Sequence, residues 1–128
     1  MALDRKHALW LAVLVLLLGS GLRMVALEHF PSGFSLDEAC ESYDAYSLWY
    51  TGRDQHGVLL PTVLRAFGDY RMPLFMYSMA PVVGTAGLSV TTARLTAAFW
   101  SILAIAATYW VGAQMFGRLA GLVAALFL

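Results

Sequence analysis

The stretch FSLDEACESYDAYSLWYTG, residues 34–52, decides the fold of the polar part of this chain. Ser35 is followed three residues later by Glu38, which is the spacing of a capping box at the start of a helix. Gly52 is typical of the residue that follows the last helical turn. The pattern therefore predicts a helix over about residues 36–50.

The same stretch carries four carboxylates within eight residues: Asp37, Glu38, Glu41 and Asp44. On a helix, Asp37, Glu41 and Asp44 fall on one face because they are spaced i, i+4 and i+7. Glu41 and Asp44 are interpreted as its solvated face. Because the helix also carries tryptophan and tyrosine, we expect it to be amphipathic and to lie along a membrane surface, with these rings at headgroup level.

The composition of the chain is that of a membrane protein. Hydrophobic residues make up 60% of its 128 residues and charged residues 12%, whereas soluble domains are about half apolar and about a quarter charged. The net charge is zero and no basic patch is present, which argues against nucleic acid as a partner. Cys40 is the single cysteine, so an internal disulfide is excluded.

Long apolar stretches predict helices that cross the membrane, which takes about 20 residues for roughly 30 Å of hydrocarbon. We expect spans at about residues 7–27, 73–92 and 95–117, and a truncated span at residues 119–128. The expected fold is an all-α integral membrane protein. Residues 1–128 would be the N-terminal part of one polytopic membrane domain.

The basic residues predict the orientation of these spans. Arg5 and Lys6 precede the first span and Arg94 lies between the second and third, so all three fall on one side of the membrane. The positive-inside rule makes that side cytoplasmic, although Arg118 falls on the other side. The expected location is the cell membrane, plasma or inner, with residues 28–71 as an extracytoplasmic loop.

The rest of the loop and the spans carry simpler patterns. TGRDQHG, residues 51–57, predicts a turn, and VLLPTVLRAFG, residues 58–68, is interpreted as a second interfacial helix broken at Pro61. Methionines are interpreted as filler of the second span: Met72, Met76 and Met79. Five glycines are expected to allow close contact between helices: Gly84, Gly87, Gly112, Gly117 and Gly121.

Two groups of residues have the chemistry of a site, and the first is Asp37 with Glu38. Adjacent side chains on a helix point in different directions, so the two carboxylates are expected to have different tasks. Asp37 is the candidate catalytic base at the boundary between water and lipid. Glu38 either closes the capping box or contributes to substrate binding, and both interpretations stay open.

The second group is Asp69, Tyr70 and Arg71, just before Pro73. Proline is favoured at the first helical position, so a helix is expected to begin there with its early N–H groups unsatisfied. Together with Arg71 these groups would bind an anion, with phosphate as the natural ligand, and Asp69 would hold the guanidinium. The alternative is an ordinary interfacial arginine paired with a nearby acid.

No metal site is predicted from the histidines, because His7, His29 and His56 lack metal-ligand spacing. Clustered carboxylates leave a divalent cation open as a cofactor, but nothing in the sequence fixes a coordination set.

Three segments in order resemble a known family: LDEACESYDAYSLWYTGRDQHGVLLP, FGDYRMPLFMYSMAP and GLSVTTARLTAAFWS. They look like the N-terminal part of the polytopic GT-C glycosyltransferases. The resemblance is nearest to the dolichyl-phosphate-mannose–protein mannosyltransferase-like group (glycosyltransferase family 39 type), which includes the bacterial aminoarabinose transferases. Here Arg71 is followed by Met72 and Pro73, where many relatives have two prolines.

This resemblance implies an inverting enzyme that moves a sugar from a polyprenyl-phosphate-linked donor to a protein, lipid or glycan acceptor at the membrane lipid surface. It makes Asp37 the first-loop acidic residue expected at the active site, either as the base or as a group that orients the acceptor, and it makes Arg71 the basic residue that binds the lipid phosphate. Glu38, Asp69 and Tyr70 complete the candidate substrate-binding set. A second acidic residue would come from a later outer loop, so residues 1–128 alone are expected to be inactive.

Two other classes of function remain as alternatives. A transporter or flippase for lipid-linked substrates would also bind an anion, but at mid-membrane on broken helices. A non-catalytic membrane subunit would use the acidic loop to bind a partner.

Overall fold

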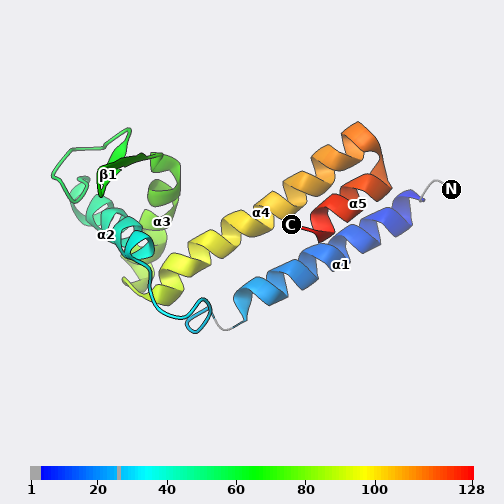
Figure 1. The fold of residues 1–128 in the computed structure, drawn as a ribbon, viewed down its shortest axis with the longest axis horizontal. Helices are drawn as coiled ribbons and strands as arrows, with labels where there is room; N and C mark the ends of the chain where they lie inside the picture. Colours follow the sequence, from blue (N-terminus) through cyan, green and yellow to red (C-terminus); the bar gives the residue numbers. More distant parts are fainter. Residues whose placement is uncertain (1–3, 26) are drawn as a thin grey trace. The chain divides into compact units, whose positions relative to one another are not determined.

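The computed structural model describes residues 4–25 and 27–128, except for the side chain of Arg5. Within this part of the chain it contains five helices and one two-stranded sheet (Figure 1). In chain order these are α1 (Arg5–Met24), α2 (Leu36–Thr51), β1 (Leu64–Ala66), β2 (Asp69–Arg71), α3 (Pro73–Ala86), α4 (Val90–Phe116) and α5 (Arg118–Leu126). The fold is mostly helical as predicted, but the hairpin makes the expectation of an all-α chain wrong in detail.

The chain divides into two compact units, which are described separately. Residues 26–96 form what we call the loop unit, which contains α2, the hairpin, α3 and the start of α4. Residues 1–25 and 97–128 form the helical unit, which contains α1, the remainder of α4 and α5.

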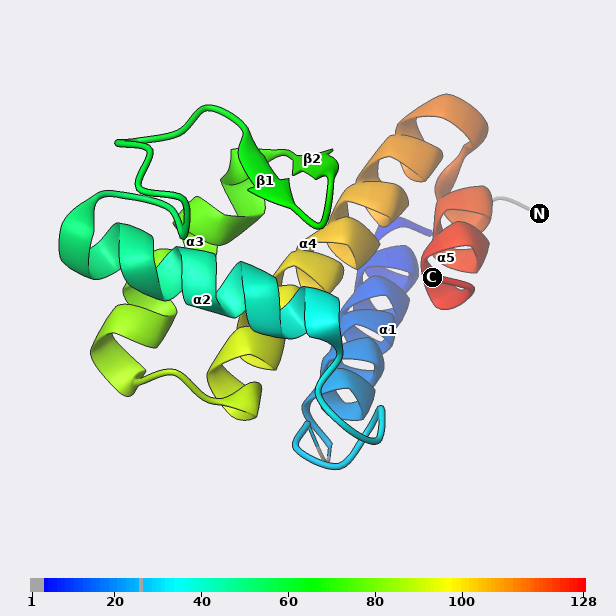
Figure 2. The ribbon, with the colours of Figure 1, turned by 60° about the vertical axis from the view of Figure 1, so that its left-hand side comes forward.

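The loop unit has its own hydrophobic core, in which α2 packs against α3 and the hairpin (Figure 2). Its buried members come from these elements and the first turn of α4: Ala45, Leu48, Leu64, Met76, Met79, Ala80, Val83 and Ala93. Met76 and Met79 are therefore core residues between protein elements, and their interpretation as filler of a membrane span is wrong. Met72, by contrast, is exposed.

Helix α3 is too short to cross a bilayer. It has 14 residues, which at 1.5 Å per residue is about 21 Å, against roughly 30 Å of hydrocarbon. It ends at Gly87, whose φ of 88° breaks the helix before Val90 starts the next one. The structure thus has no single helix over residues 73–92. Among the described residues, Lys6–Met24 and Val90–Phe116 are the helices long and apolar enough to span a membrane.

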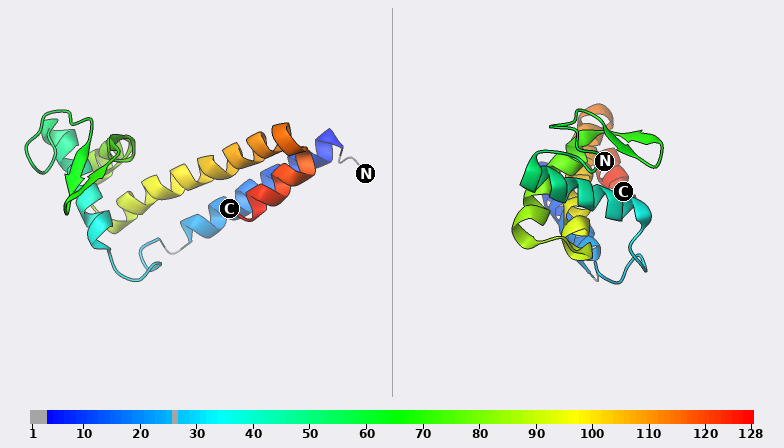
Figure 3. Two further views of the ribbon diagram at one scale, coloured as in Figure 1. Left: turned by 45° about the horizontal axis from the view of Figure 1, so that its top comes forward. Right: turned by 90° about the vertical axis from the view of Figure 1, so that its left-hand side faces the viewer.

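In the helical unit, α5 folds back next to α4 and α1 (Figure 3). Gly112 and Gly121 permit the close approach, because a Cβ on Gly121 would lie 2.6 Å from the Ala113 nitrogen and the Tyr109 oxygen. This confirms the expected role of these two glycines. Gly117 differs, since its φ of 92° lies at the turn between α4 and α5.

The segment of residues 58–68 is not a helix, contrary to the prediction. Its second half forms β1, which pairs with β2 in antiparallel register, Leu64 opposite Arg71 and Ala66 opposite Asp69. Phe67 and Gly68 connect the strands with φ values of 50° and 85°. Two positive φ angles match the right-handed twist of a two-residue hairpin, so the chain reverses here and enters α3 at Pro73.

Candidate functional site

The N-terminus of α2 forms as its sequence predicts. The Glu38 N–H donates to Ser35 Oγ at 3.1 Å, and the Ser35 N–H donates to Glu38 Oε2 at 3.0 Å. The reciprocal pair is a complete capping box, and Gly52 ends the helix in the left-handed conformation. This local chemistry places Asp37 in the first turn, where its side chain is 71% exposed.

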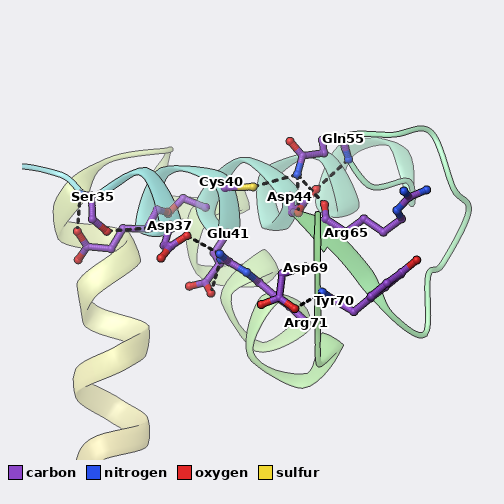
Figure 4. A network of polar contacts seen from close by, with 12 residues as sticks. Ser35, Asp37, Cys40, Glu41, Asp44, Gln55, Arg65, Asp69, Tyr70 and Arg71 are labelled. Atoms are coloured by element: carbon purple, nitrogen blue, oxygen red, sulfur yellow. Dashed lines mark hydrogen bonds and ion pairs between the residues drawn. The ribbon is translucent and has the colours of Figure 1, made fainter. Parts of the chain in front are cut away.

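Arg71 reaches α2 because of the hairpin register. Its partner across the sheet is Leu64, which is fully buried, so both side chains lie on the face that α2 covers. Nη1 of Arg71 donates to Glu41 Oε1 at 2.9 Å, and Nη2 donates to Asp37 Oδ1. Figure 4 shows the guanidinium between the two carboxylates. These contacts raise the pKa of Arg71, with the Asp37 hydrogen bond as the main cause and burial opposing it.

Asp69 and Tyr70 do not join this cluster. The Tyr70 N–H donates to Asp69 Oδ1 at 2.7 Å, while the Tyr70 ring lies 5.8 Å from the guanidinium carbon of Arg65. The ring points away from Arg71 (Figure 4). The expectation that Asp69 holds the Arg71 guanidinium is therefore wrong in this structure, where the carboxylates on α2 make those contacts.

The interpretation of Glu41 and Asp44 as a solvated face is also wrong. They do share a face with Asp37, which is exposed, but Gln55 and Arg71 contact the part of that face that carries Asp44 and Glu41. The Glu41 side chain is only 26% exposed, and Asp44 is 2% exposed. Asp44 accepts from the Gln55 N–H at 2.8 Å and from Gln55 Nε2 at 3.2 Å (Figure 4). Burial is the main cause that raises the pKa of both Glu41 and Asp44.

Arg94 is a residue of this region that the sequence interpretation missed. It lies in the first turns of α4, its side chain is 5% exposed, and its Nε donates to Glu38 Oε1 at 3.0 Å. This hydrogen bond is the main cause that lowers the pKa of Glu38, against the effect of burial. Arg94 also donates to the backbone oxygens of Leu27 and Gly33.

These contacts overturn the placement of Arg94 across the membrane from residues 28–71, because it bonds directly to that segment. The sequence did hold a signal. Arg94 is the one charged residue between Met72 and Gly117, and a lone charge in an apolar stretch normally has a buried partner. Its place between two expected spans does not indicate which residue that partner is.

The arrangement has two chemical capabilities. The exposed carboxylate of Asp37 could accept a proton. The guanidinium of Arg71 beside it could bind an anion. The N-cap of α3, Met72, provides no side-chain hydrogen bond to the helix, and Arg71 directly precedes it. The first N–H groups of a helix in this state favour an anionic ligand. Arg71 itself is already paired, so an incoming anion must compete with Asp37 and Glu41 for it.

Within residues 4–25 and 27–128, no group of three or more histidine, cysteine or acidic side chains is placed to hold a metal ion.

Searches of protein-family models, of curated proteins and of solved structures returned no match to this chain.

Proposed function

We propose that this chain is part of a membrane glycosyltransferase that moves a sugar from a polyprenyl-phosphate-linked donor to an acceptor at the extracytoplasmic face. The observation that carries the proposal is the direct meeting of Asp37 and Arg71, which are 34 residues apart in the chain. The carboxylate can take the proton that the acceptor loses. The guanidinium, together with the N-terminus of α3, can stabilise the negative charge that the leaving phosphate gains. The resemblance of the three segments around these residues supplies the reaction class.

In the proposed reaction, the acceptor hydroxyl or amine attacks the anomeric carbon while the bond from that carbon to the phosphate oxygen breaks. Asp37 takes the proton that the acceptor loses. The leaving lipid phosphate gains negative charge, which Arg71 and the N-terminus of α3 stabilise. For this, Arg71 exchanges its hydrogen bond with Asp37 for one with the phosphate, and this exchange also frees Asp37 to act as a base.

The proposed orientation uses α1 and α4 as the two crossings. Arg94 lies with the loop unit, so the chain crosses once before this unit, in α1, and once after it, in α4. Arg118 follows the second crossing and therefore falls on the same side as Arg5 and Lys6. That side is cytoplasmic by the positive-inside rule, and the loop unit is extracytoplasmic. The basic residues of the loop unit weigh little here, because the segment between the crossings exceeds about 60 residues.

One observation favours a second candidate, a non-catalytic membrane subunit. Arg71 is already paired with two carboxylates, those of Asp37 and Glu41, as it would be in a purely structural contact. In that case the ion pairs serve to fix the hairpin on α2, and the exposed apolar residues of α2 would contact a partner.

The experiment that separates the two is Asp37→Asn in the intact protein, with transfer measured in membranes supplied with a radiolabelled polyprenyl-phosphate sugar. Loss of the base should lower the rate about 10²–10⁴-fold. Arg71→Gln should also lower the rate, because Arg71 stabilises the charge that develops on the leaving phosphate, and it should in addition raise the KM for the donor. Glu28→Gln, which removes a carboxylate that bonds to Thr91, is the matched control and should transfer normally. A normal rate for correctly inserted Asp37→Asn would refute the enzyme assignment.

A further inference from the structure

We propose that Arg94 is a positioning residue that fixes Asp37 through Glu38, an inference that rests on the proposed function. Asp37 and Glu38 are adjacent on α2, and each carboxylate pairs with its own arginine. Asp37 meets Arg71 from the hairpin, whereas Glu38 meets Arg94 from α4. The first turn of α2 is therefore fixed between two guanidinium groups that belong to different elements.

Arg94 connects three segments of the loop unit by four hydrogen bonds. Nε and Nη2 donate to the two carboxylate oxygens of Glu38, at 3.0 Å and 3.3 Å. Nη1 donates to the Leu27 oxygen at 2.7 Å, and Nη2 donates to the Gly33 oxygen. The connection that leads into α2 and the first turn of α2 are thus both bound to the start of α4.

The geometry requires arginine and not merely a positive charge. A planar guanidinium can address both oxygens of a carboxylate and further acceptors on its other edge, whereas an ammonium group is a compact point charge. The Arg94 side chain is 5% exposed and the Glu38 side chain 29% exposed, so removing the guanidinium would leave a partly buried carboxylate without its charged partner. It would also take one donor from each of two backbone oxygens.

Loss of Arg94 is expected to affect Asp37 because Asp37 lies in the helical turn that Glu38 and Arg94 hold in place. The capping box of Ser35 and Glu38 shares the Glu38 carboxylate with Arg94, so loss of Arg94 loosens the turn that carries Asp37. Arg71 and the N-terminus of α3 are held by the hairpin and by the core, not by Arg94. Misplacement of a reacting group by about 1 Å can lower a rate about 10²-fold, so we expect an effect on kcat more than on donor binding.

The test compares Arg94→Lys and Arg94→Gln with wild type in the intact protein, with a radiolabelled polyprenyl-phosphate sugar as donor. Both variants should lower kcat by about 10- to 100-fold and change the KM for the donor less than about threefold. Arg53→Gln is the control, because Arg53 is an exposed arginine of the same unit that donates to one backbone oxygen, that of Gly57. It should leave both constants unchanged.

A double-mutant cycle distinguishes positioning from general damage. In an Asp37→Asn background, Arg94→Lys should cause little further loss, since there is no base left to position. Thermal unfolding and the alkylation rate of Cys40, the single cysteine and a residue of α2, report folding without any activity. If Arg94→Gln unfolds by these measures, Arg94→Lys decides the question.

Three outcomes overturn the inference. One is a folded Arg94→Lys variant with the kcat of wild type, and another is a loss that multiplies fully with that of Asp37→Asn. Either outcome would refute the role of Arg94 only. The proposed function would still stand if the Asp37→Asn variant is inactive. The third is normal transfer by Asp37→Asn itself, which would refute the proposed function together with the role of Arg94.

Discussion

Arg71 and Glu41 form an ion pair at 2.9 Å, although 30 residues separate them in the chain. Glu41 is mostly covered, and burial raises the pKa of its carboxyl group while Arg71 opposes that rise. The pair therefore holds Arg71 against α2 at some cost in desolvation. An anionic ligand of Arg71 would therefore have to compete with the carboxylate of Glu41 as well as with that of Asp37.

Replacing Glu41 by Gln should make Arg71 more available to an anionic ligand. The amide keeps an oxygen that can accept from Nη1, but it removes the charge that competes with phosphate. Partly exposed ion pairs are worth about 0.2–1 kcal/mol, so we expect the KM for the polyprenyl-phosphate donor to fall by a factor of about 1.4 to 5. Initial rates over a range of donor concentrations measure this change.

Glu28→Gln is the control for that experiment, because it also removes one carboxylate from the loop unit but contacts Thr91 instead of Arg71. Its KM should equal that of wild type. An increased KM in Glu41→Gln would contradict the prediction and would assign Glu41 to orienting Arg71 for its ligand.

The ion pair between Arg94 and Glu38 predicts a dependence of stability on pH. The pKa of Glu38 is lowered from its ordinary value of 4.5, chiefly by the hydrogen bond from Arg94. The folded state therefore binds a proton less readily than the unfolded state. Its contribution to stability is present above about pH 4.5 and is lost as the pH falls through the lowered folded value. Wild type should lose more Tm on acidification than Glu38→Gln.

Asp44 provides a comparison of opposite sign. Burial raises its pKa above the ordinary 3.8, so the folded state binds a proton more readily than the unfolded state. As the pH falls through that raised value, wild type should gain stability relative to Asp44→Asn. Thermal unfolding of the three proteins between about pH 6 and pH 3.5 measures both trends. Parallel curves for all three would show that neither group is linked to folding.

The contact between Trp49 and Gly84 should make Gly84 intolerant of any side chain. A Cβ on Gly84 would lie 2.2 Å from Cγ of the Trp49 ring, which is close to the backbone and cannot simply swing aside. Gly84→Ala therefore forces Trp49 out of its place between α2 and α3. We expect a loss of about 1–3 kcal/mol in the free energy of unfolding, measured by denaturant titration.

Gly21→Ala is the matched control, because nothing lies within 4 Å of a Cβ at that helical position. It should be neutral or stabilising, since alanine is favoured over glycine inside a helix by about 1 kcal/mol. Trp49→Ala should also reduce the cost of Gly84→Ala in a double variant. Equal costs with and without the indole ring would place the clash elsewhere.

The hairpin turn predicts a stabilising substitution at Phe67. This residue has a φ of 50°, a conformation that costs most L-residues about 1–2 kcal/mol but that asparagine adopts readily. The ring is exposed, so little packing is lost when it is replaced. Phe67→Asn should therefore raise the free energy of unfolding by about 1 kcal/mol, measured by denaturant titration.

Phe67→Ala separates the backbone effect from the loss of the ring. Alanine has the same difficulty with positive φ as phenylalanine, so this variant should not be stabilised. A gain of equal size in both variants would mean that removing the exposed ring, and not relieving the turn, is the cause.

The sequence alone was sufficient for features that local interactions decide. The capping box of Ser35 and Glu38, with Gly52 at the other end, predicted α2 to within a residue. The apolar stretches predicted α1 and α4, because a long run with few charges can satisfy its backbone only as a helix in lipid. The sequence also placed Asp37, Glu41 and Asp44 on one face.

The sequence was misleading where an apolar stretch could be buried either in a protein core or in lipid, because both environments favour the same apolar side chains. The apolar stretch that starts at Pro73 has the length of a membrane span, but α2 and the hairpin cover Met76 and Met79 instead. The hairpin itself was missed because Phe67 stands where a turn of this kind normally has asparagine. The apolar run before it has no period that separates a strand from a helix.

Only the tertiary structure decided which carboxylate meets which arginine. Asp37 meets Arg71 and Glu38 meets Arg94, across 34 and 56 residues of chain. Pairings of this kind depend on the strand register and on how α4 begins, and no local pattern encodes either. The physical reason is that a charge is attracted to every opposite charge within reach. The packed core determines which one it can contact.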